Sequence, residues 1–320
     1  MITVVIPYFQ RSPGVLQKAL ASVAAQQACP LPVHVIVVDD ASPVPAQAEI
    51  TSAALPNSIS VNVITQPNGG PGAARNTGLD AVPTGTRYVS FLDSDDEWSP
   101  DHLARAVAAL EQGFDFYFAD HFQLGQTVGA FDRAGRIHPD KHPHLSTPHV
   151  GLHAYKGDMF DQILRGNVVG TSTVVYRLER FAAERFRVEF TTAGEDYLFW
   201  MALASQGARV AFSGQIEATY GKGVNVFAGS GWGTDAHLLR VHQEIRFRQA
   251  VRQKFALDAT QRKHISHDLQ RLRLAFVRDV LHRLRHRKSF PDGLLVAHAK
   301  LDPLTFAGMP LSVLNILFRR

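Results

Sequence analysis

Apolar and polar positions alternate along the first third of the chain in a rhythm of strand and helix. Four short runs are rich in Val, Ile and aromatic residues and end at polar residues, as strands do. The predicted strands are residues 3–7, 33–38, 58–65 and 88–92. Between them apolar residues recur at helical spacing, for example Leu16, Leu20 and Val23. The predicted helices are residues 15–27, 45–55 and 73–81. This order predicts a doubly wound, mostly parallel α/β sheet of the Rossmann-like kind.

The rest of the chain is predicted to be mixed at first and helical afterwards. Residues 114–122 and 168–176 have strand character, and residues 196–206 have helical spacing. Residues 125–148 are rich in Gly, Pro and His, which predicts a loop excursion. Residues 234–288 predict helix, because one apolar stripe runs along them at intervals of three and four residues. The stripe consists of Ile265, Leu269, Leu272, Phe276, Val280 and Leu284.

Composition and charge add a domain boundary to this picture. The 320 residues are 45% apolar and 19% charged, which is typical of a globular protein and excludes wholesale disorder. Cys29 is the sole cysteine, so the chain can form no internal disulfide. The net charge is +4, but residues 234–290 hold 14 Lys or Arg against 5 Asp or Glu. We therefore predict one domain over residues 1–233 and a basic helical region over 234–320, which is either an appended module or an ordinary solvated face.

The chain carries no sequence signal for crossing a membrane. No uncharged apolar run reaches the roughly 20 residues that a spanning helix needs. The first residues lack the basic start of a signal peptide. We therefore expect a cytoplasmic protein, either free or peripheral at the inner face of the membrane.

An acidic cluster directly follows the predicted strand at 88–92. Residues 93–97 read Asp-Ser-Asp-Asp-Glu, so four carboxylates that repel one another lie within five residues. A divalent cation relieves that repulsion, and hard oxygen ligands select Mg²⁺ or Mn²⁺. In an extended segment Asp93 and Asp95 project to the same side. The alternative is a solvated acidic turn.

Three further segments carry candidate chemistry, each with a structural alternative. Asp39 and Asp40 end the strand at 33–38, where they can accept hydrogen bonds from a ribose or a base, or simply form a turn. The glycine turn at 68–72 precedes a helix that carries Arg75, which suits a phosphate but equally a tight turn. Asp196 precedes an apolar helix, either as its N-cap or as a general base.

These segments together resemble the inverting family 2 glycosyltransferases of the GT-A fold. Each motif is weak alone, but all five occur in the family's order over about residues 1–230. The matching segments are 4–8, 37–42, 72–78, 91–96 and 194–196. The resemblance implies a nucleotide-sugar part over about 1–112 and an acceptor part over about 113–233. It does not cover the basic helical region.

The resemblance also implies a donor site. Pro7 and Tyr8 would line the pocket for the base, and Asp39 would accept a hydrogen bond from a base N–H, such as that of uracil. Arg75 would lie near the base or the diphosphate, and Asp93 would contact the ribose.

The implied reaction centre is completed by a metal ligand and a base. Asp95 would hold Mn²⁺ or Mg²⁺, and Asp196 would deprotonate the acceptor hydroxyl. Many relatives carry a late histidine that helps to bind the metal or the diphosphate. The corresponding segment here is 220–225, where Lys222 stands on a glycine-flanked stretch and would offset diphosphate charge instead.

We therefore expect a metal-dependent, inverting hexosyltransferase that moves one sugar from a UDP-linked donor to a hydroxyl, in polysaccharide or glycolipid assembly. The Gln-x-x-Arg-Trp signature of processive relatives is absent, which favours single-sugar transfer. One alternative is an inactive nucleotide-sugar binding module. Another is a nucleotidyltransferase, which is disfavoured because residues 7–11 contain no glycine. Nucleic acid is not an expected partner, because the aromatic residues of the basic region follow the apolar pattern.

The basic region suggests a further partner. Its amphipathic stripe and the apolar segment 304–318, which is followed by Arg319 and Arg320, fit binding to an anionic membrane surface. That would place the site near a carbohydrate acceptor, including a lipid-linked one. Alternatively, the stripe packs on the catalytic domain or on a second copy in a homodimer through the C-terminal helices.

Overall fold

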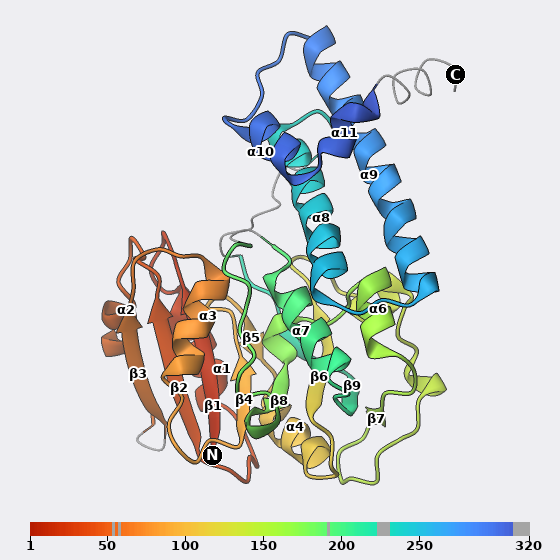
Figure 1. Ribbon diagram of the computed structural model, residues 1–320. Coiled ribbons are helices and arrows are strands. Elements are labelled where there is room, and N and C mark those ends of the chain that lie inside the picture. The colour runs from red at the N-terminus through yellow and green to blue at the C-terminus, as the bar shows by residue number, and fades with distance from the viewer. Residues whose placement is uncertain (53–54, 57–58, 191–192, 223–230, 310–320) are drawn as a thin grey trace. The chain divides into compact units, whose positions relative to one another are not determined.

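The computed structural model describes residues 1–52, 55–56, 59–190, 193–222 and 231–309 (Figure 1). It divides the chain into two compact units, Met1–Val224 and Asn225–Arg320. The division lies a few residues before the boundary expected after residue 233. The predicted apolar tail lies mostly outside the described residues, and so do Gly223 and Gly229, two of the glycines that follow Lys222.

The first half of the sheet in the first unit is parallel throughout. Its strands, in spatial order, are β3 (Ser60–Thr65), β2 (Val33–Asp39), β1 (Ile2–Tyr8) and β4 (Tyr88–Phe91). The connecting helices are α1 (Val15–Ala24), α2 (Ala46–Ser52) and α3 (Pro71–Asp80).

Helices cover both faces of this parallel half. Val35 and Val37 of β2 belong to the same buried cluster as residues of α1 and α2, whereas Ile36 and Val38 pack with Ala74 of α3. Successive residues of a strand point to opposite faces, so a strand covered on both sides has a nearly continuous run of apolar residues. The doubly wound α/β arrangement predicted from the sequence is confirmed.

The second half of the sheet is mixed. β8 (Val175–Arg177) runs antiparallel to both β4 and β6 (Phe116–Phe122), and β9 (Val210–Thr219) runs parallel to β6. The short strands β5 (Glu97–Trp98) and β7 (Leu152–Ala154) pair antiparallel with β9. The other helices of this unit are α4 (His102–Leu110), α5 (Ala130–Ala134), α6 (Met159–Arg165) and α7 (Glu195–Ser205), with 3₁₀ turns η1 (Pro139–Lys141), η2 (Thr171–Thr173) and η3 (Leu178–Arg180).

The strand predicted over 168–176 is wrong for most of its length. Residues 171–173 form the 3₁₀ turn η2, and β8 begins only at Val175. The Thr173 hydroxyl donates to the carbonyl of Gly170 at 2.8 Å. Such a local side-chain hydrogen bond competes with the strand ladder for the backbone, which a pattern of apolar residues does not reveal.

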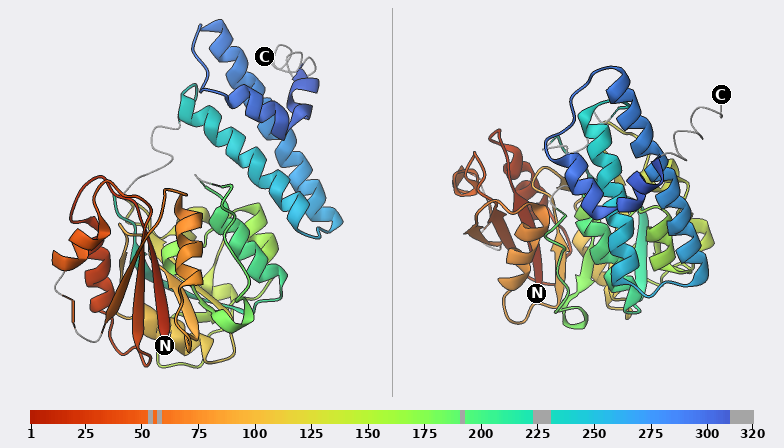
Figure 2. Two further views of the ribbon diagram at one scale, coloured as in Figure 1. Left: turned by 60° about the vertical axis from the view of Figure 1, so that its left-hand side comes forward. Right: turned by 45° about the horizontal axis from the view of Figure 1, so that its top comes forward.

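The described residues of the second unit form helices. They are α8 (Asp235–Lys254), α9 (Ala259–Arg285), α10 (Leu294–Leu301) and α11 (Pro303–Ala307). α8 and α9 pack side by side (Figure 2). The helical stretch predicted over 234–288 is interrupted at Asp258, which caps α9 in a capping box with Gln261.

The predicted amphipathic stripe forms the core of this helical unit. Its first five residues, Ile265 to Val280, are at most 5% exposed, and α8 contributes buried Leu238, Val241 and Ile245. Leu284 alone is exposed. The expectation that the stripe as a whole faces a membrane is therefore wrong, because its apolar area is covered within the unit. Among the described residues, no helix combines the length and apolarity needed to cross a bilayer.

Candidate active site

The carboxyl ends of β1, β2 and β4 meet at one edge of the sheet. Tyr8 and Asp39 are register partners at the ends of β1 and β2, and Asp93 follows β4. The backbone N–H of Leu92 donates to the carbonyl of Val5, which keeps the end of β4 beside β1. In open α/β sheets ligands bind beyond this edge, so the topology collects the predicted donor-site residues in one region.

The two aspartates at the end of β2 organise loops. Both Asp39 oxygens accept backbone N–H groups, from Ser42 and from Ala46, each at 2.8 Å. Asp40 accepts the N–H groups of Gly69 and Gly70, also at 2.8 Å. The backbone N–H groups of Gly69 and Gly70 therefore bind a carboxylate of the protein, whereas the sequence of the glycine turn suggested that they bind a phosphate. The role of Asp39 toward a base stays a prediction.

Pro7 and Tyr8 are buried at the end of β1. The Tyr8 side chain is 1% exposed and packs in the core with α1. Burial, with the charge of Glu49, raises the pKa of Tyr8 to about 12, so the phenol is neutral. The predicted contact of these two residues with a base is untested by this arrangement and stays a prediction.

Arg75 of α3 is the centre of a buried ion-pair bridge. Its Nη2 lies 2.7 Å from Oδ1 of Asp93, and its Nη1 lies 3.0 Å from Oε1 of Glu195, the first residue of α7. Arg75 is 4% exposed, Glu195 is 6% exposed and Asp93 is 34% exposed. Arg75 therefore joins residues 93–97 after β4, which we call the acidic loop, to α7, the helix that carries Asp196.

Burial dominates the ionisation of Glu195. It raises the pKa of this carboxyl to about 7, with a further increase from the neighbouring charge of Asp196, although Arg75 acts in the opposite direction. One oxygen of Glu195, Oε2, is buried without a hydrogen-bond partner among the described residues. The sequence analysis did not name Glu195 as a site residue. The available signal was its position directly before Asp196, the candidate base.

Asp196 lies in the first turn of α7. Its Oδ2 accepts the hydroxyl of Thr171 at 3.0 Å, and its Oδ1 accepts the N–H of Tyr197 at 2.8 Å. Gly194 occupies the N-cap position of α7, so the alternative interpretation of Asp196 as N-cap is wrong. Burial raises the pKa of Asp196. A carboxylate that is partly exposed and binds protons more readily than usual is suited to general-base chemistry.

The acidic loop is anchored through its buried member, Asp96. Asp96 accepts the hydroxyl of Ser172 at 2.5 Å and the N–H of Gly221 at 3.0 Å, and it is 3% exposed. Asp93 and Asp95 remain partly exposed. The loop is therefore not the solvated acidic turn of the alternative interpretation, since the buried carboxylate of Asp96 fixes it to the protein.

The 3₁₀ turn η2 links Asp196, the candidate base, to the acidic loop. Thr171 donates to Asp196, and the hydroxyl of the next residue, Ser172, donates to Asp96 and accepts the N–H of Asp93 at 3.0 Å. Gly170 precedes the turn, and a Cβ atom there would lie 2.6 Å from the hydroxyl of Tyr220. Sequence reasoning missed this turn; three consecutive hydroxyl residues after a glycine were the only signal.

Lys222 lies beside the same loop. It is exposed and follows Gly221, where a Cβ atom would overlap the backbone carbonyl of Asp95. This close approach requires glycine and brings the segment 220–222 against Asp95 and Asp96. The structure thus places Lys222 at the acidic loop, while its contact with a diphosphate stays a prediction.

Comparison with known proteins decides the family of the chain. The sequence model for "Glycosyl transferase family 2" matches residues 3–168, more than half of the chain. The chain belongs to glycosyltransferase family 2. Succinoglycan biosynthesis protein ExoW of Rhizobium meliloti is 36% identical over 233 residues, which are 71% of this chain and 70% of that protein. The putative teichuronic acid biosynthesis glycosyltransferase TuaG of Bacillus subtilis is 23% identical over 184 residues, 57% of this chain and 65% of that protein.

Solved structures confirm the GT-A fold expected for this glycosyltransferase. S. aureus TarS 1-349 in complex with UDP-GlcNAc matches with a TM-score of 0.56 at 18% identity, over 89% of this chain and 72% of that chain. The mannosyltransferase PcManGT from Pyrobaculum calidifontis, in complex with GDP-Man and Mn²⁺, matches with a TM-score of 0.55 at 16% identity, over 98% and 84%.

The carboxylates of the acidic loop in this glycosyltransferase fit a divalent metal ion whose other ligands come largely from the bound substrate. Within the described ranges, no three His, Cys, Asp or Glu side chains converge as a metal-binding group. Mg²⁺ in phosphate chemistry typically takes one or two protein carboxylates and completes its shell with water and substrate phosphates. Asp95, partly exposed beside a buried carboxylate and an arginine-paired one, would be such a ligand.

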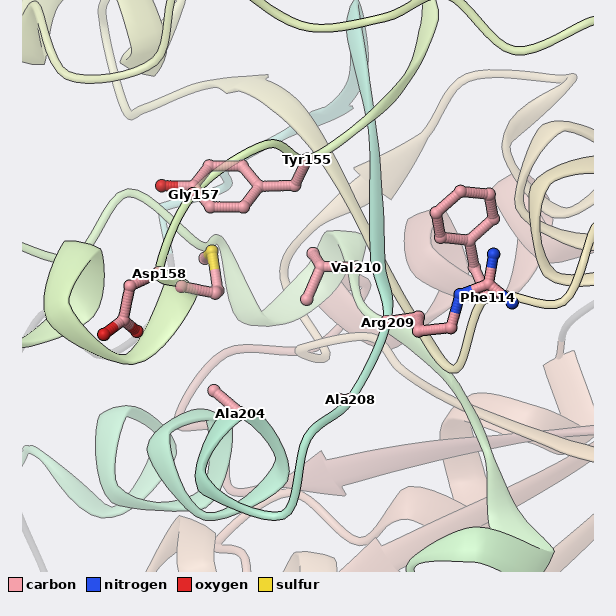
Figure 3. Close-up of a pocket in the computed structure, with 9 residues that line it drawn as sticks. Phe114, Tyr155, Gly157, Asp158, Ala204, Ala208, Arg209 and Val210 are labelled. Carbon is pink, nitrogen blue, oxygen red and sulfur yellow. The ribbon is translucent and has the colours of Figure 1, made fainter.

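A hollow of about 270 Å³ lies elsewhere in the glycosyltransferase domain (Figure 3). Phe114, Tyr155, Asp158 and Arg209 are among its lining residues. Phe114 lies two residues before β6 and Arg209 directly precedes β9, and both strands run parallel to β4. The hollow therefore lies at the amino ends of these strands, away from the edge that carries Asp93, and is not part of the candidate active site.

Proposed function

We propose that this protein is a metal-dependent, inverting glycosyltransferase that moves one sugar from a nucleotide-sugar donor to a hydroxyl of a carbohydrate or lipid-linked carbohydrate acceptor. The observation that carries the proposal is the linkage of Asp196 to the acidic loop. Thr171 and Ser172 join them on one side and Arg75 joins them on the other. Such a frame holds a base at a defined distance from a donor-binding loop, as a single displacement requires.

Asp196 performs the proton transfer in this proposal. The acceptor hydroxyl attacks the anomeric carbon while its proton passes to Asp196, and the bond from that carbon to the nucleoside diphosphate breaks. One displacement inverts the configuration of the anomeric carbon. The hydrogen bond from Thr171 orients the carboxylate, and the raised pKa of Asp196 favours proton uptake.

Charge on the departing diphosphate is the second requirement. Asp95 would hold Mn²⁺ or Mg²⁺ together with the donor's phosphates, and the metal would neutralise the leaving group. Lys222 would approach the same phosphates from the segment against the acidic loop. Asp93 would contact the ribose, with its position fixed by Arg75.

The substrate classes follow from the relatives. UDP is the proposed nucleotide, supported by the UDP-GlcNAc complex of TarS, with Pro7, Tyr8 and Asp39 on the side of the base. GDP is the competing candidate, because PcManGT was solved with GDP-Man. The names of ExoW and TuaG support a place in polysaccharide assembly. We assign donor binding to about residues 1–112 and acceptor binding to about 113–233. Transfer of single sugars and a homodimer through the C-terminal helices stay predictions.

A donor panel tests the proposal. Nucleoside diphosphate release is measured from UDP- and GDP-sugars with Mn²⁺, with EDTA, and for Asp95→Asn. Asp292→Asn is the matched control, because Asp292 is an exposed residue of the helical unit. We expect release from a UDP-sugar that EDTA and Asp95→Asn abolish and that the control retains. Full activity in EDTA refutes the metal requirement, and binding of donors without any release leaves the alternative of an inactive binding module. Release of pyrophosphate from a nucleoside triphosphate and a sugar phosphate supports a nucleotidyltransferase instead.

A further inference from the structure

One end of the helical unit exposes apolar and basic side chains together. Leu284 is 60% exposed and Trp232 is 55% exposed, although both are large apolar residues. The residues that follow Leu284, namely Arg285, His286, Arg287 and Lys288, are all exposed. We call Trp232 and residues 284–288 the basic tip. Cations at the end of a helix are favoured by its dipole, but that does not explain the two exposed apolar residues.

Contacts bring the two segments of the basic tip together. The Lys288 ammonium donates to the carbonyl of Gly233 at 3.2 Å, directly beside Trp232. The ring of Trp232 lies 6.0 Å from that of His282, which in turn lies 4.4 Å from the ring of His286. Trp232 and the end of α9 therefore form one continuous surface.

The basic tip is held rigid from below by Arg283. This side chain is 1% exposed and pairs with Asp279 at 3.0 Å and with Asp235 of α8 at 2.6 Å. It also donates to the carbonyl of Ser289 at 2.7 Å. The start of α8 and the chain after α9 are thus fixed to one buried guanidinium, so the tip does not need to be ordered when it meets a partner.

The opposite end of the helix pair provides an internal comparison. The connection between α8 and α9 lies about 30 Å away, the length of the 20-residue α8 (Figure 1). Arg252, Lys254 and Arg262 are exposed there, but the nearby Leu257 is 8% exposed. Leu304, which is 59% exposed, lines a hollow with Arg252 near that end. Both ends are therefore basic with an exposed leucine, and the basic tip differs by its exposed tryptophan.

We propose that the basic tip docks on an anionic lipid surface. Tryptophan favours the boundary between headgroups and acyl chains, where its ring is buried and its N–H stays near water. Leu284 enters the same boundary, while Arg285, Arg287 and Lys288 meet lipid phosphates. This surface is independent of the active-site chemistry, and it replaces the membrane face that the amphipathic stripe was expected to supply.

The test uses the full chain and vesicles of phosphatidylcholine with or without phosphatidylserine. The tip variant is Arg285→Gln/Arg287→Gln/Lys288→Gln. The control variant Arg252→Gln/Lys254→Gln/Arg262→Gln removes the same number of charges at the opposite end. We expect wild type to cosediment with anionic vesicles at low salt and to be released at high salt. Each lost tip charge should lower the partition coefficient about fivefold, so the tip variant falls about 100-fold, and the control less than about fivefold.

Tryptophan fluorescence reports the docking site directly. Of the three tryptophans, Trp98 and Trp200 are buried, at 6% and 0% exposure, so Trp232 is the exposed one. We expect a blue shift with anionic vesicles that Trp232→Phe removes, and quenching by brominated lipids.

Three outcomes overturn the proposal: no binding of wild type, equal losses in the tip and control variants, or binding without a change in Trp232. Thermal unfolding by circular dichroism checks that each variant is folded. Nucleoside diphosphate release in the absence of vesicles should be unchanged in the tip variant, so failure here is distinguishable from failure of the proposed activity.

Discussion

Replacing Arg75 by methionine tests whether the buried bridge supports both stability and activity. Methionine keeps much of the length of the side chain but removes its charge. The change leaves Glu195, which is 6% exposed, without its cation, and it frees Asp93, which is 34% exposed. Removing one partner of a buried ion pair costs about 3–5 kcal/mol, whereas an exposed pair is worth about 0–1 kcal/mol. With one buried and one partly exposed carboxylate, we expect a loss of about 3 kcal/mol at pH 8.

The loss should depend on pH through Glu195. The folded-state pKa of Glu195 is about 7, above the 4.5 of an unperturbed glutamate. Protonation therefore favours the folded state, and the stability that this group contributes is lost as the pH rises from about 4.5 through 7. Arg75 lowers the pKa of Glu195, so the pKa of Glu195 is higher in the Arg75→Met variant. The stability of the variant therefore continues to fall with rising pH beyond the point at which that of wild type levels off. At pH 5.5 Glu195 is protonated in both proteins, and the difference should shrink to about 1 kcal/mol.

Urea unfolding at pH 5.5 and pH 8 measures both numbers. In a Trp232→Phe background the fluorescence reports the first unit alone, because Trp98 and Trp200 both lie there. Arg87→Met is the matched control, since its pair with Glu111 at 2.7 Å is about half exposed on both sides. The double variant Arg75→Met/Glu195→Gln should lose the pH dependence.

Equal losses at both pH values would show that Glu195 is not the responsible group. A loss below about 1 kcal/mol at pH 8 would refute the buried bridge. We also expect little activity from Arg75→Met where it is folded, because Asp93 and α7 lose their link.

Three further substitutions test the candidate site. Asp196→Asn should lower kcat at least about 100-fold with nucleotide affinity nearly unchanged, and a parallel collapse of affinity would place Asp196 on the donor side. Thr171→Val should lower kcat about tenfold. It should also move the acidic limb of the pH profile of kcat to higher pH, because the Thr171 hydrogen bond lowers the pKa of Asp196. Thr171→Ser should restore both kcat and the profile, and a pH profile that does not move in Thr171→Val would contradict a positioning role for Thr171. Lys222→Ala should weaken UDP binding up to about fivefold in calorimetry and lower kcat, most clearly at low salt, whereas kinetics identical to wild type would make Lys222 an ordinary surface lysine.

The sequence by itself determined the elements whose burial follows from a local pattern. β2 is apolar without interruption from Val35 to Val38 because helices cover both faces of the sheet, and that pattern is readable without coordinates. The acidic cluster after β4 and the dyad at the end of β2 were likewise visible, since strand ends and carboxylate runs are local features. Family membership followed from the order of these motifs and is confirmed.

Only the tertiary structure decided which of these residues are joined. Arg75 and Glu195 are 120 residues apart, and Thr171 lies 25 residues before Asp196, so no periodicity connects them. The capture of the Gly69 and Gly70 N–H groups by Asp40 was equally invisible, because a glycine turn offers the same donors to a phosphate and to a carboxylate. The amphipathic stripe of α9 was correctly recognised from the sequence. An apolar stripe predicts that one face of a helix is buried, but it does not identify the surface against which that face packs. Packing against α8 made it core and left Leu284 with Trp232 at the surface.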